Sequence, residues 1–217
     1  MRAIVVRLIL GLIQGLDRWK LARLARRHPG LEIHPTASSN LAMARFELGP
    51  GARVRIEAGV TTERRRDGVR FCVGEGSELV IGEGTWLRSE LQPVHLAVFD
   101  GARMNLGRGV FLNGCHLSAK ESVDLGTFAM VGPGSRVFDA DQHPIDADRP
   151  ERRSRVEIGD YAWVAADVTV TRGVRIGAHS IVGARSVVTD DIPDHRVAVG
   201  SPARPGGRVG DRSVHPF

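Results

Sequence analysis

The chain has 217 residues, a formal net charge of +5 and a sequence pI near 10.1, and 42% of its residues are hydrophobic. Its basic residues alternate with Asp and Glu and form no continuous basic block, which argues against nucleic-acid binding and favours an anionic small molecule or an acidic membrane surface. The 26 glycines and 5% aromatic residues are typical of an elongated domain built from small turns and stacked aliphatic side chains.

The first predicted element is an amphipathic helix within residues 1–29. Apolar residues from Val5 to Trp19 recur at helical spacing, whereas Arg7 and Arg18 fall on the other side. The apolar run is too short to span a bilayer, and Arg7 interrupts it in a way that argues against an export signal. Two interpretations stay open. The helix packs on its own domain or a neighbouring subunit, or it makes a peripheral membrane contact through its apolar side and the basic residues after it.

From residue 158 onward an aliphatic residue returns at every sixth position and is followed by a small residue. A period of six fits the strand period of two but not the helical period of 3.6, so these side chains share one face of short strands. Weaker versions of the pattern, with phase shifts, run from Leu48 to Met104. We predict an all-β domain of stacked coils over residues 30–201 and a C-terminal tail at 202–217, which is loose from Pro205 to Phe217. The regular positions are Ile158, Val164, Val170, Ile176, Val182 and Val188.

One polar segment, residues 138–155, interrupts the repeat and predicts a loop that protrudes from the wall of the domain. Catalytic groups often lie on loops that a rigid scaffold positions. The segment carries His143 beside carboxylates, and an imidazole titrates near neutrality when a partner fixes its tautomer. His143 is therefore the candidate general base.

These features together resemble the hexapeptide-repeat acyltransferases. The likeness rests on the six-residue repeat, on the Asp-x-Asp-x-His-Pro sequence of residues 139–144, and on the blocks 158–164 and 199–204. It is strongest to the branch of maltose, galactoside and polysaccharide O-acetyltransferases. It covers Leu106 to Arg204 by motif and the region from Leu48 to Met104 by periodicity alone.

The resemblance implies a left-handed parallel β-helix of hexapeptide repeats with an N-terminal α-helix, three hexapeptides per coil, and a homotrimer with active sites between subunits. It also implies transfer of an acetyl group from acetyl-CoA, as co-substrate, to a hydroxyl or amine. The loop histidine, here His143, takes the acceptor proton, and no acyl-enzyme and no metal are needed.

Further positions carry over from the family to this chain. The resemblance implies that a tryptophan lies along the coenzyme arm, that small corner residues line the pantetheine channel, and that a closing segment and arginines meet the nucleotide end. Those positions are Trp163, Ala165, Gly183, Ala184, Arg185, Pro202 and Arg204. It also implies that Asn113 orients the acceptor and that Asp141, with Glu121 and Asp139 as alternatives, holds the imidazole.

The sequence thus predicts O-acetylation of a sugar hydroxyl in a polysaccharide, a lipopolysaccharide or a lipid-linked glycan intermediate, in the cytoplasm or at the inner face of the cytoplasmic membrane. The alternatives are an N-acetyltransferase acting on an amino-sugar nucleotide and a small-molecule or xenobiotic O-acetyltransferase. A zinc carbonic anhydrase on the same fold is disfavoured, because it uses a His-x-x-x-x-His pair that this sequence lacks. Cys72 and Cys115 lie far apart and predict no disulfide framework, which agrees with a reducing compartment.

Overall fold

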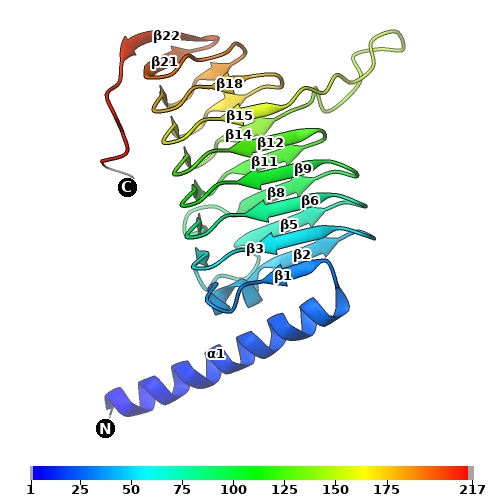
Figure 1. Cartoon of the computed structure of the whole chain (residues 1–217), viewed down its shortest axis with the longest axis vertical. Coiled ribbons are helices and arrows are strands. Elements are labelled where there is room, and N and C mark those ends of the chain that lie inside the picture. Colours follow the sequence, from blue (N-terminus) through cyan, green and yellow to red (C-terminus); the bar gives the residue numbers. More distant parts are fainter. Residues whose placement is uncertain (1, 215–217) are drawn as a thin grey trace.

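A computed structural model describes residues 2–214, so residue 1 and residues 215–217, the ends of the two predicted terminal segments, lie outside the described part. The chain winds into a left-handed parallel β-helix whose three sheets form the walls of a prism, and α1 (Arg2–Arg27) crosses one end of the stack (Figure 1). The predicted fold class is confirmed. Sheets 1, 2 and 3 are numbered here in the order in which each coil visits them.

Each sheet takes one strand from each coil, and the parallel pairing runs from coil to coil. Sheet 1 contains β1 (Leu31–Ile33), β3 (Arg53–Ile56), β6 (Glu78–Ile81), β9 (Arg103–Leu106), β12 (Ser122–Leu125), β15 (Val156–Ile158) and β18 (Arg175–Ile176). Sheet 2 contains β4 (Thr61–Thr62), β7 (Trp86–Arg88), β10 (Phe111–Asn113), β13 (Met130–Val131), β16 (Trp163–Val164), β19 (Ile181–Val182), β21 (Arg196–Gly200) and β22 (Ala203–Arg208). Sheet 3 contains β2 (Arg45–Leu48), β5 (Val69–Val73), β8 (Val94–Val98), β11 (His116–Ala119), β14 (Arg136–Phe138), β17 (Thr169–Val170) and β20 (Val187–Val188). In the first coil a short 3-10 helix, η1 (Ser39–Met43), precedes β2.

The coils shorten along the chain. Arg53 pairs with Glu78, and Glu78 with Arg103, so each of these coils takes 25 residues. Glu157 pairs with Arg175, so a later coil takes 18 residues, which is three hexapeptides. This difference explains why the six-residue period is regular only in the C-terminal half, although the same three walls are present throughout.

The predicted aliphatic positions fill the centre of the prism and are at most 1% exposed. Val131, Val164 and Val182 lie in register on neighbouring strands of sheet 2, so each side chain packs on the next coil. The small residues after them are required by close backbone contact. A Cβ on Gly159 would lie 2.6 Å from the backbone nitrogen of Ala178, a distance that real side chains do not adopt.

The corner between sheets 1 and 2 carries a ladder of stacked rings from four coils. Phe128, Tyr161, His179 and His195 all have φ between 54° and 58°, a region that non-glycine residues occupy at a cost. Successive ring centroids lie 5.5, 5.1 and 4.7 Å apart. Stacking between coils offsets part of that backbone cost.

The C-terminal segment follows this ladder. β22 turns back antiparallel on β21, and the Arg212 backbone N–H then donates to Nδ1 of His179 at 3.1 Å while its Nε donates to the Tyr161 carbonyl at 2.9 Å. The prediction of a loose tail from Pro205 onward is therefore wrong for residues 205–213. Strand pairing and these bonds satisfy backbone groups that glycine and proline content alone did not reveal.

α1 contacts the stack through its second half. Leu21 is buried, and the buried carboxylate of Asp17 accepts from Nε of Arg64 at 3.1 Å. Most of the apolar side predicted from the sequence, by contrast, is exposed, at Leu8, Ile9, Leu12, Leu16 and Trp19. The side chain of Val5, which was part of that prediction, lies outside the described part. The helix thus packs on its own domain, as the first of the two interpretations states. The residues that make this contact are not the predicted apolar ones. Over residues 2–214, no helix combines the length and apolar character that crossing a bilayer requires.

Candidate active site

The polar segment predicted as a loop is a narrow arm that leaves the stack between β14 and β15, at the corner of sheets 3 and 1 (Figure 1). Its two limbs pair near the base, where Ala140 and Arg153 form an antiparallel bridge. The backbone N–H of Asp141 donates to the carbonyl of Arg152 at 3.0 Å. These bonds give the arm a defined direction away from the wall.

Lys120, on the coil below, joins both limbs of the arm to the wall. Its Nζ donates to the carbonyl of Gln142 at 3.2 Å and to Oε1 of Glu151 at 2.6 Å. The same ammonium lies 4.9 Å from the ring centroid of Phe99. Both partners of the Lys120–Glu151 ion pair are largely buried, and the pair lowers the pKa of Glu151. Lys120 therefore fixes the backbone next to His143.

Asp139 closes the base of the arm. Its carboxylate is fully buried and accepts the backbone N–H groups of Lys120 at 2.8 Å and Glu121 at 2.7 Å. Burial raises the pKa of Asp139, and these two donors oppose that shift. Asp139 thus bonds the wall and not an imidazole within this chain.

The predicted partner Asp141 is engaged by two arginines. Arg172, on the coil above, donates to Oδ1 at 2.5 Å, and Arg152 of the arm donates to Oδ2 at 3.1 Å. These hydrogen bonds lower the pKa of Asp141, and the one from Arg172 has the largest effect. Asp141 is therefore held as a carboxylate that ties the arm to the coil above it.

His143 itself is exposed and directly follows Gln142, which has a φ of 70°. Across residues 2–214 no group hydrogen-bonds its ring, so both ring nitrogens are open to an acceptor and to a further partner. Glu121, the third candidate to hold the imidazole, is also exposed and lies at the base of the arm.

The residues expected to bind the coenzyme gather elsewhere, on sheet 2 and at its corner with sheet 3. Trp163 lies on β16 with 38% of its surface exposed, and Arg212 of the C-terminal segment lies 5.5 Å from its ring centroid. Ala165 directly follows β16, and Gly183, Ala184 and Arg185 follow β19 one coil further on. The structure therefore places these positions side by side along the stack.

Two further residues expected to bind the coenzyme, Pro202 and Arg204, lie at the start of β22, and Arg204 is already paired within the chain. Pro202 precedes β22 after a cis peptide bond, and Arg204 on β22 is held by Oδ2 of Asp190 at 2.7 Å. Both side chains of that pair are exposed, so the ion pair is weak and exchangeable for an anionic ligand. A Cβ on Gly183 would lie 2.7 Å from Cγ1 of Val199, so packing alone already requires a glycine there.

Asn113, expected to orient the acceptor, ends β10 on sheet 2, two strands from Trp163. Within residues 2–214 its Oδ1 is buried without a hydrogen-bond partner, and so is Nε2 of His116 just beyond the same corner. Buried polar atoms normally have partners. Within one chain, the full width of sheet 3 separates Asn113, at the corner of sheets 2 and 3, from the arm, at the corner of sheets 3 and 1.

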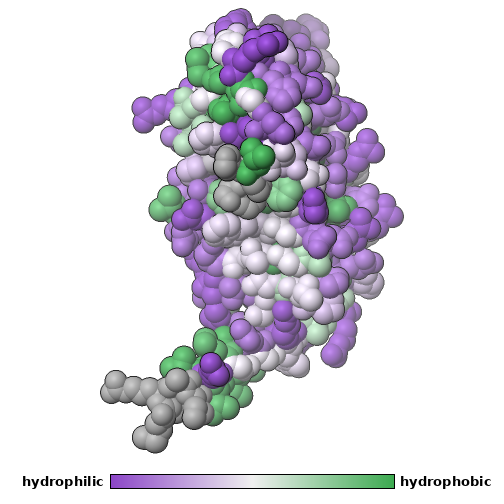
Figure 2. All heavy atoms as spheres, turned by 60° about the vertical axis from the view of Figure 1, so that its left-hand side comes forward, coloured by the Kyte–Doolittle hydropathy of each residue, from purple (hydrophilic) through white to green (hydrophobic). Residues whose placement is uncertain are grey.

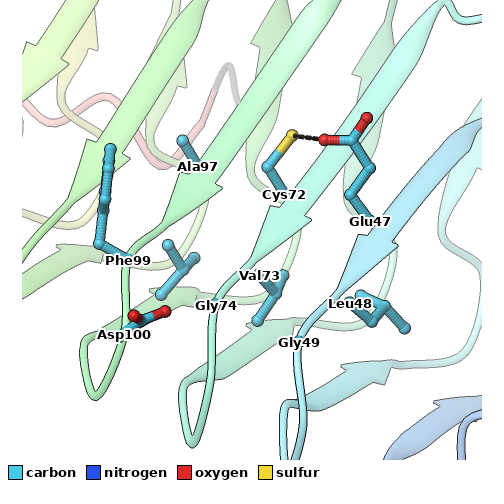
Figure 3. A pocket seen from close by; sticks show the side chains of 10 residues that line it. Glu47, Leu48, Gly49, Cys72, Val73, Gly74, Ala97, Phe99 and Asp100 are labelled. Atoms are coloured by element: carbon cyan, nitrogen blue, oxygen red, sulfur yellow. Dashed lines mark hydrogen bonds between the residues drawn. The ribbon is translucent and has the colours of Figure 1, made fainter.

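A groove of about 480 Å³ lies on sheet 3 beneath the arm (Figure 3). Its end nearest the arm is formed by Phe99, whose ring contacts Lys120. Burial raises the pKa of Cys72 to about 11, so this thiol stays protonated and hydrogen-bonds Oε2 of Glu47 at 3.3 Å. The groove is lined by Glu47, Leu48, Gly49, Cys72, Val73, Gly74, Ala97, Val98, Phe99 and Asp100.

His116 predicts a pH dependence of stability. Its ring stacks on His95 at 4.5 Å, and burial, with smaller contributions from His95 and Arg136, lowers its pKa to about 4 from 6.5. As the pH falls, the unfolded chain takes up the His116 proton at a higher pH than the folded chain does. The contribution of His116 to the free energy of unfolding should therefore be constant above about pH 6.5 and fall as the pH drops towards 4. Denaturant titrations at several pH values should show a shallower fall for His116→Phe. An equal fall of the unfolding free energy with pH in both proteins would contradict a lowered pKa of His116.

Sequence reasoning missed Lys120 and Arg172, which hold the arm from below and from above. Lys120 lies 31 residues from Glu151, and Arg172 lies 31 residues from Asp141. The available signal was positional, since both residues stand at the corner of sheets 3 and 1 from which the arm leaves. Reading it requires the length of each coil.

Comparison with known proteins agrees with this architecture. Residues 155–190 match the family described as bacterial transferase hexapeptide (six repeats). The chain is 38% identical over 91 residues to a galactoside O-acetyltransferase of Lactococcus lactis, covering 40% of this chain and 44% of that protein. It is 42% identical over 60 residues to the galactoside O-acetyltransferase of Escherichia coli, covering 28% and 30%. The chain thus spans less than half the length of these curated relatives.

Among solved structures, the polySia-specific acetyltransferase NeuO superposes with a TM-score of 0.67 at 22% identity, over 79% of this chain and 78% of that one. At this identity the likeness concerns the fold. Together with the family match, it confirms the resemblance to the hexapeptide-repeat acyltransferases that the motifs predicted.

Proposed function

We propose that this chain transfers an acetyl group from acetyl-CoA to a sugar hydroxyl of a glycan or glycan-lipid acceptor, with His143 as the general base. The observation that carries the proposal is an exposed imidazole, which no group of residues 2–214 hydrogen-bonds, on an arm that Lys120 and Arg172 tie to two coils. Similarity to galactoside O-acetyltransferases supports the reaction class and a sugar acceptor.

In the proposed reaction His143 accepts the proton of the acceptor hydroxyl while that oxygen attacks the thioester carbonyl. The new C–O bond forms a tetrahedral oxyanion, which backbone N–H groups would stabilise. When the C–S bond breaks, the proton on His143 passes to the departing thiolate. The balance needs no oxidant, and no covalent bond to the protein forms.

Sheet 2 supports the binding of the coenzyme. Trp163 offers an exposed ring, and the small residues Ala165 and Ala184 leave the corner with sheet 3 open to an extended chain such as pantetheine. Arg185 is exposed at the same corner, where its guanidinium is available to a phosphate.

A homotrimer would bring the two halves of this site together. The arm and the coenzyme residues lie at different corners of one chain, whereas a second copy could present its sheet 2 to the arm of the first. The Oδ1 of Asn113, which has no partner in the described part of the chain, supports this arrangement, because such a buried acceptor is expected where another copy or a ligand supplies the donor. We place this assembly in the cytoplasm, where acetyl-CoA is available.

The test is release of free thiol from acetyl-CoA, followed with a chromogenic disulfide, against a panel of oligosaccharides, nucleotide sugars and small xenobiotic alcohols and amines. Acceptor-dependent release with an oligosaccharide, and a base-labile ester in the product, support the proposal. An amide product would assign N-acetylation instead, and no thiol release with any acceptor would contradict acetyl transfer.

Lys120→Ala should lower kcat about ten- to hundredfold without changing the KM for acetyl-CoA, because it frees the arm but leaves sheet 2 intact. Lys20→Ala is the matched control, since Lys20 is the chain's other lysine and lies on α1. Steady-state kinetics of the three proteins would measure the effect. An unchanged kcat in Lys120→Ala would show that anchoring the arm does not position His143.

A further inference from the structure

The side of α1 that faces away from the stack changes character along its length. At about 100° per residue, the side opposite the buried Asp17 and Leu21 carries apolar residues in the first half of the helix and basic residues in the second. On this side the apolar side chains more than half exposed are Leu8, Leu12, Leu16 and Trp19. Val6, Ile9 and Leu10 are also more than half exposed, elsewhere around the first half of the helix. The basic residues that follow on this side are Arg23 and Arg26, and Arg27 lies at its edge.

The apolar half projects beyond the coils, and hydrophobic side chains gather at this end of the molecule (Figures 1 and 2). Nothing in residues 2–214 covers these side chains, and contiguous exposed apolar surface of this kind is unusual for a protein that stays free in solution. Trp19 stands at the junction of the apolar and basic parts, with Arg23 at 5.5 Å from its ring centroid. Tryptophan is favoured at the boundary between lipid and water.

Charge decides between the possible partners. Asp17 is the sole acidic residue of α1, and its carboxylate is already bound by Arg64 at 3.1 and 3.2 Å, with Lys20 at 3.7 Å. Arg23, Arg26 and Arg27, unlike Lys20, therefore have no acidic counterpart within the helix. Apposing this face to its own copy would bring like charges together, whereas an anionic surface would neutralise them.

We propose that α1 docks on an anionic lipid membrane, with the apolar side of residues 8–19 inserted into one leaflet and Arg23, Arg26 and Arg27 on the headgroups. The stretch from Val6 to Trp19 is 14 residues, or about 21 Å of helix, against a hydrocarbon core of about 30 Å. The helix enters one leaflet without crossing. This role is independent of the acetyl transfer proposed above, because the surface shares no residue with the candidate active site.

The test is sedimentation of the full chain with vesicles of phosphatidylcholine alone or with about 30% phosphatidylglycerol. Wild-type protein should sediment with the anionic vesicles and stay in solution with the neutral ones. Arg23→Glu/Arg26→Glu should weaken anionic binding at least tenfold, since each basic residue near the surface contributes about 1 kcal/mol. The matched control Arg53→Glu/Arg103→Glu reverses two exposed arginines on sheet 1 and should bind as wild type.

A second pair of variants tests the apolar part. Leu12→Glu/Leu16→Glu should abolish sedimentation, and Leu91→Glu, which changes a leucine that is 70% exposed on the stack, should not. Circular dichroism and light scattering on the same samples check folding and oligomer size. The proposal would be overturned if wild type ignored anionic vesicles, or if Leu12→Glu/Leu16→Glu changed the oligomer size but not vesicle binding, which would make α1 a contact between copies.

Discussion

His143→Ala should lower kcat/KM for acetyl transfer by about a hundredfold to ten-thousandfold, the range expected when a general base is removed. Binding of acetyl-CoA should be unchanged, because the coenzyme residues lie on sheet 2 and the arm meets the wall through Lys120 and Arg172. Thiol-release kinetics give the first quantity, and calorimetric titration with CoA gives the second.

His34→Ala provides the control, because His34 is exposed in the first coil, where its Nδ1 bonds Thr36 at 2.9 Å, far along the stack from the arm. It should keep wild-type kinetics. If His143→Ala retained more than about a tenth of the wild-type rate, a different residue or water would have to accept the proton.

Leu117→Ala should destabilise the fold by about 2–5 kcal/mol, the cost of emptying a buried leucine site. Leu117 is fully buried on β11, in register with Leu96 and Val137 on the neighbouring coils, so the cavity would have rigid walls above and below. Denaturant unfolding measures the change. The matched variant Leu91→Ala, at an exposed leucine, should stay within about 0.5 kcal/mol of wild type. Similar losses for both would contradict the assignment of Leu117 to the core.

The sequence was most informative where a coil is three hexapeptides long. From Ile158 to Val188 each aliphatic residue could be placed inside from its spacing alone, because the side-chain period of a strand is two and the corners recur every six residues. Upstream, coils of 25 residues break that period, so the walls were predicted there only in outline.

Contacts between coils set the limit of sequence reasoning at the site. The family resemblance made Asp141 the expected partner of His143, yet its oxygens bind Arg152 and Arg172. Local spacing could not show that competition, because Arg172 approaches only after a full coil has been wound. The packing of Arg212 against Trp163 is hidden for the same reason, since it depends on the return of the chain along the corner of sheets 1 and 2.

Whether two copies build one site can be measured by mixing two inactive variants. His143→Ala and Asn113→Ala should each be inactive, and co-refolding them should restore up to about a quarter of the wild-type sites if the arm of one copy serves sheet 2 of the next. Thiol release per total protein is the readout, with each variant refolded alone as the control. Recovery on mixing would support a shared site, whereas no recovery, or activity in either variant alone, would contradict it.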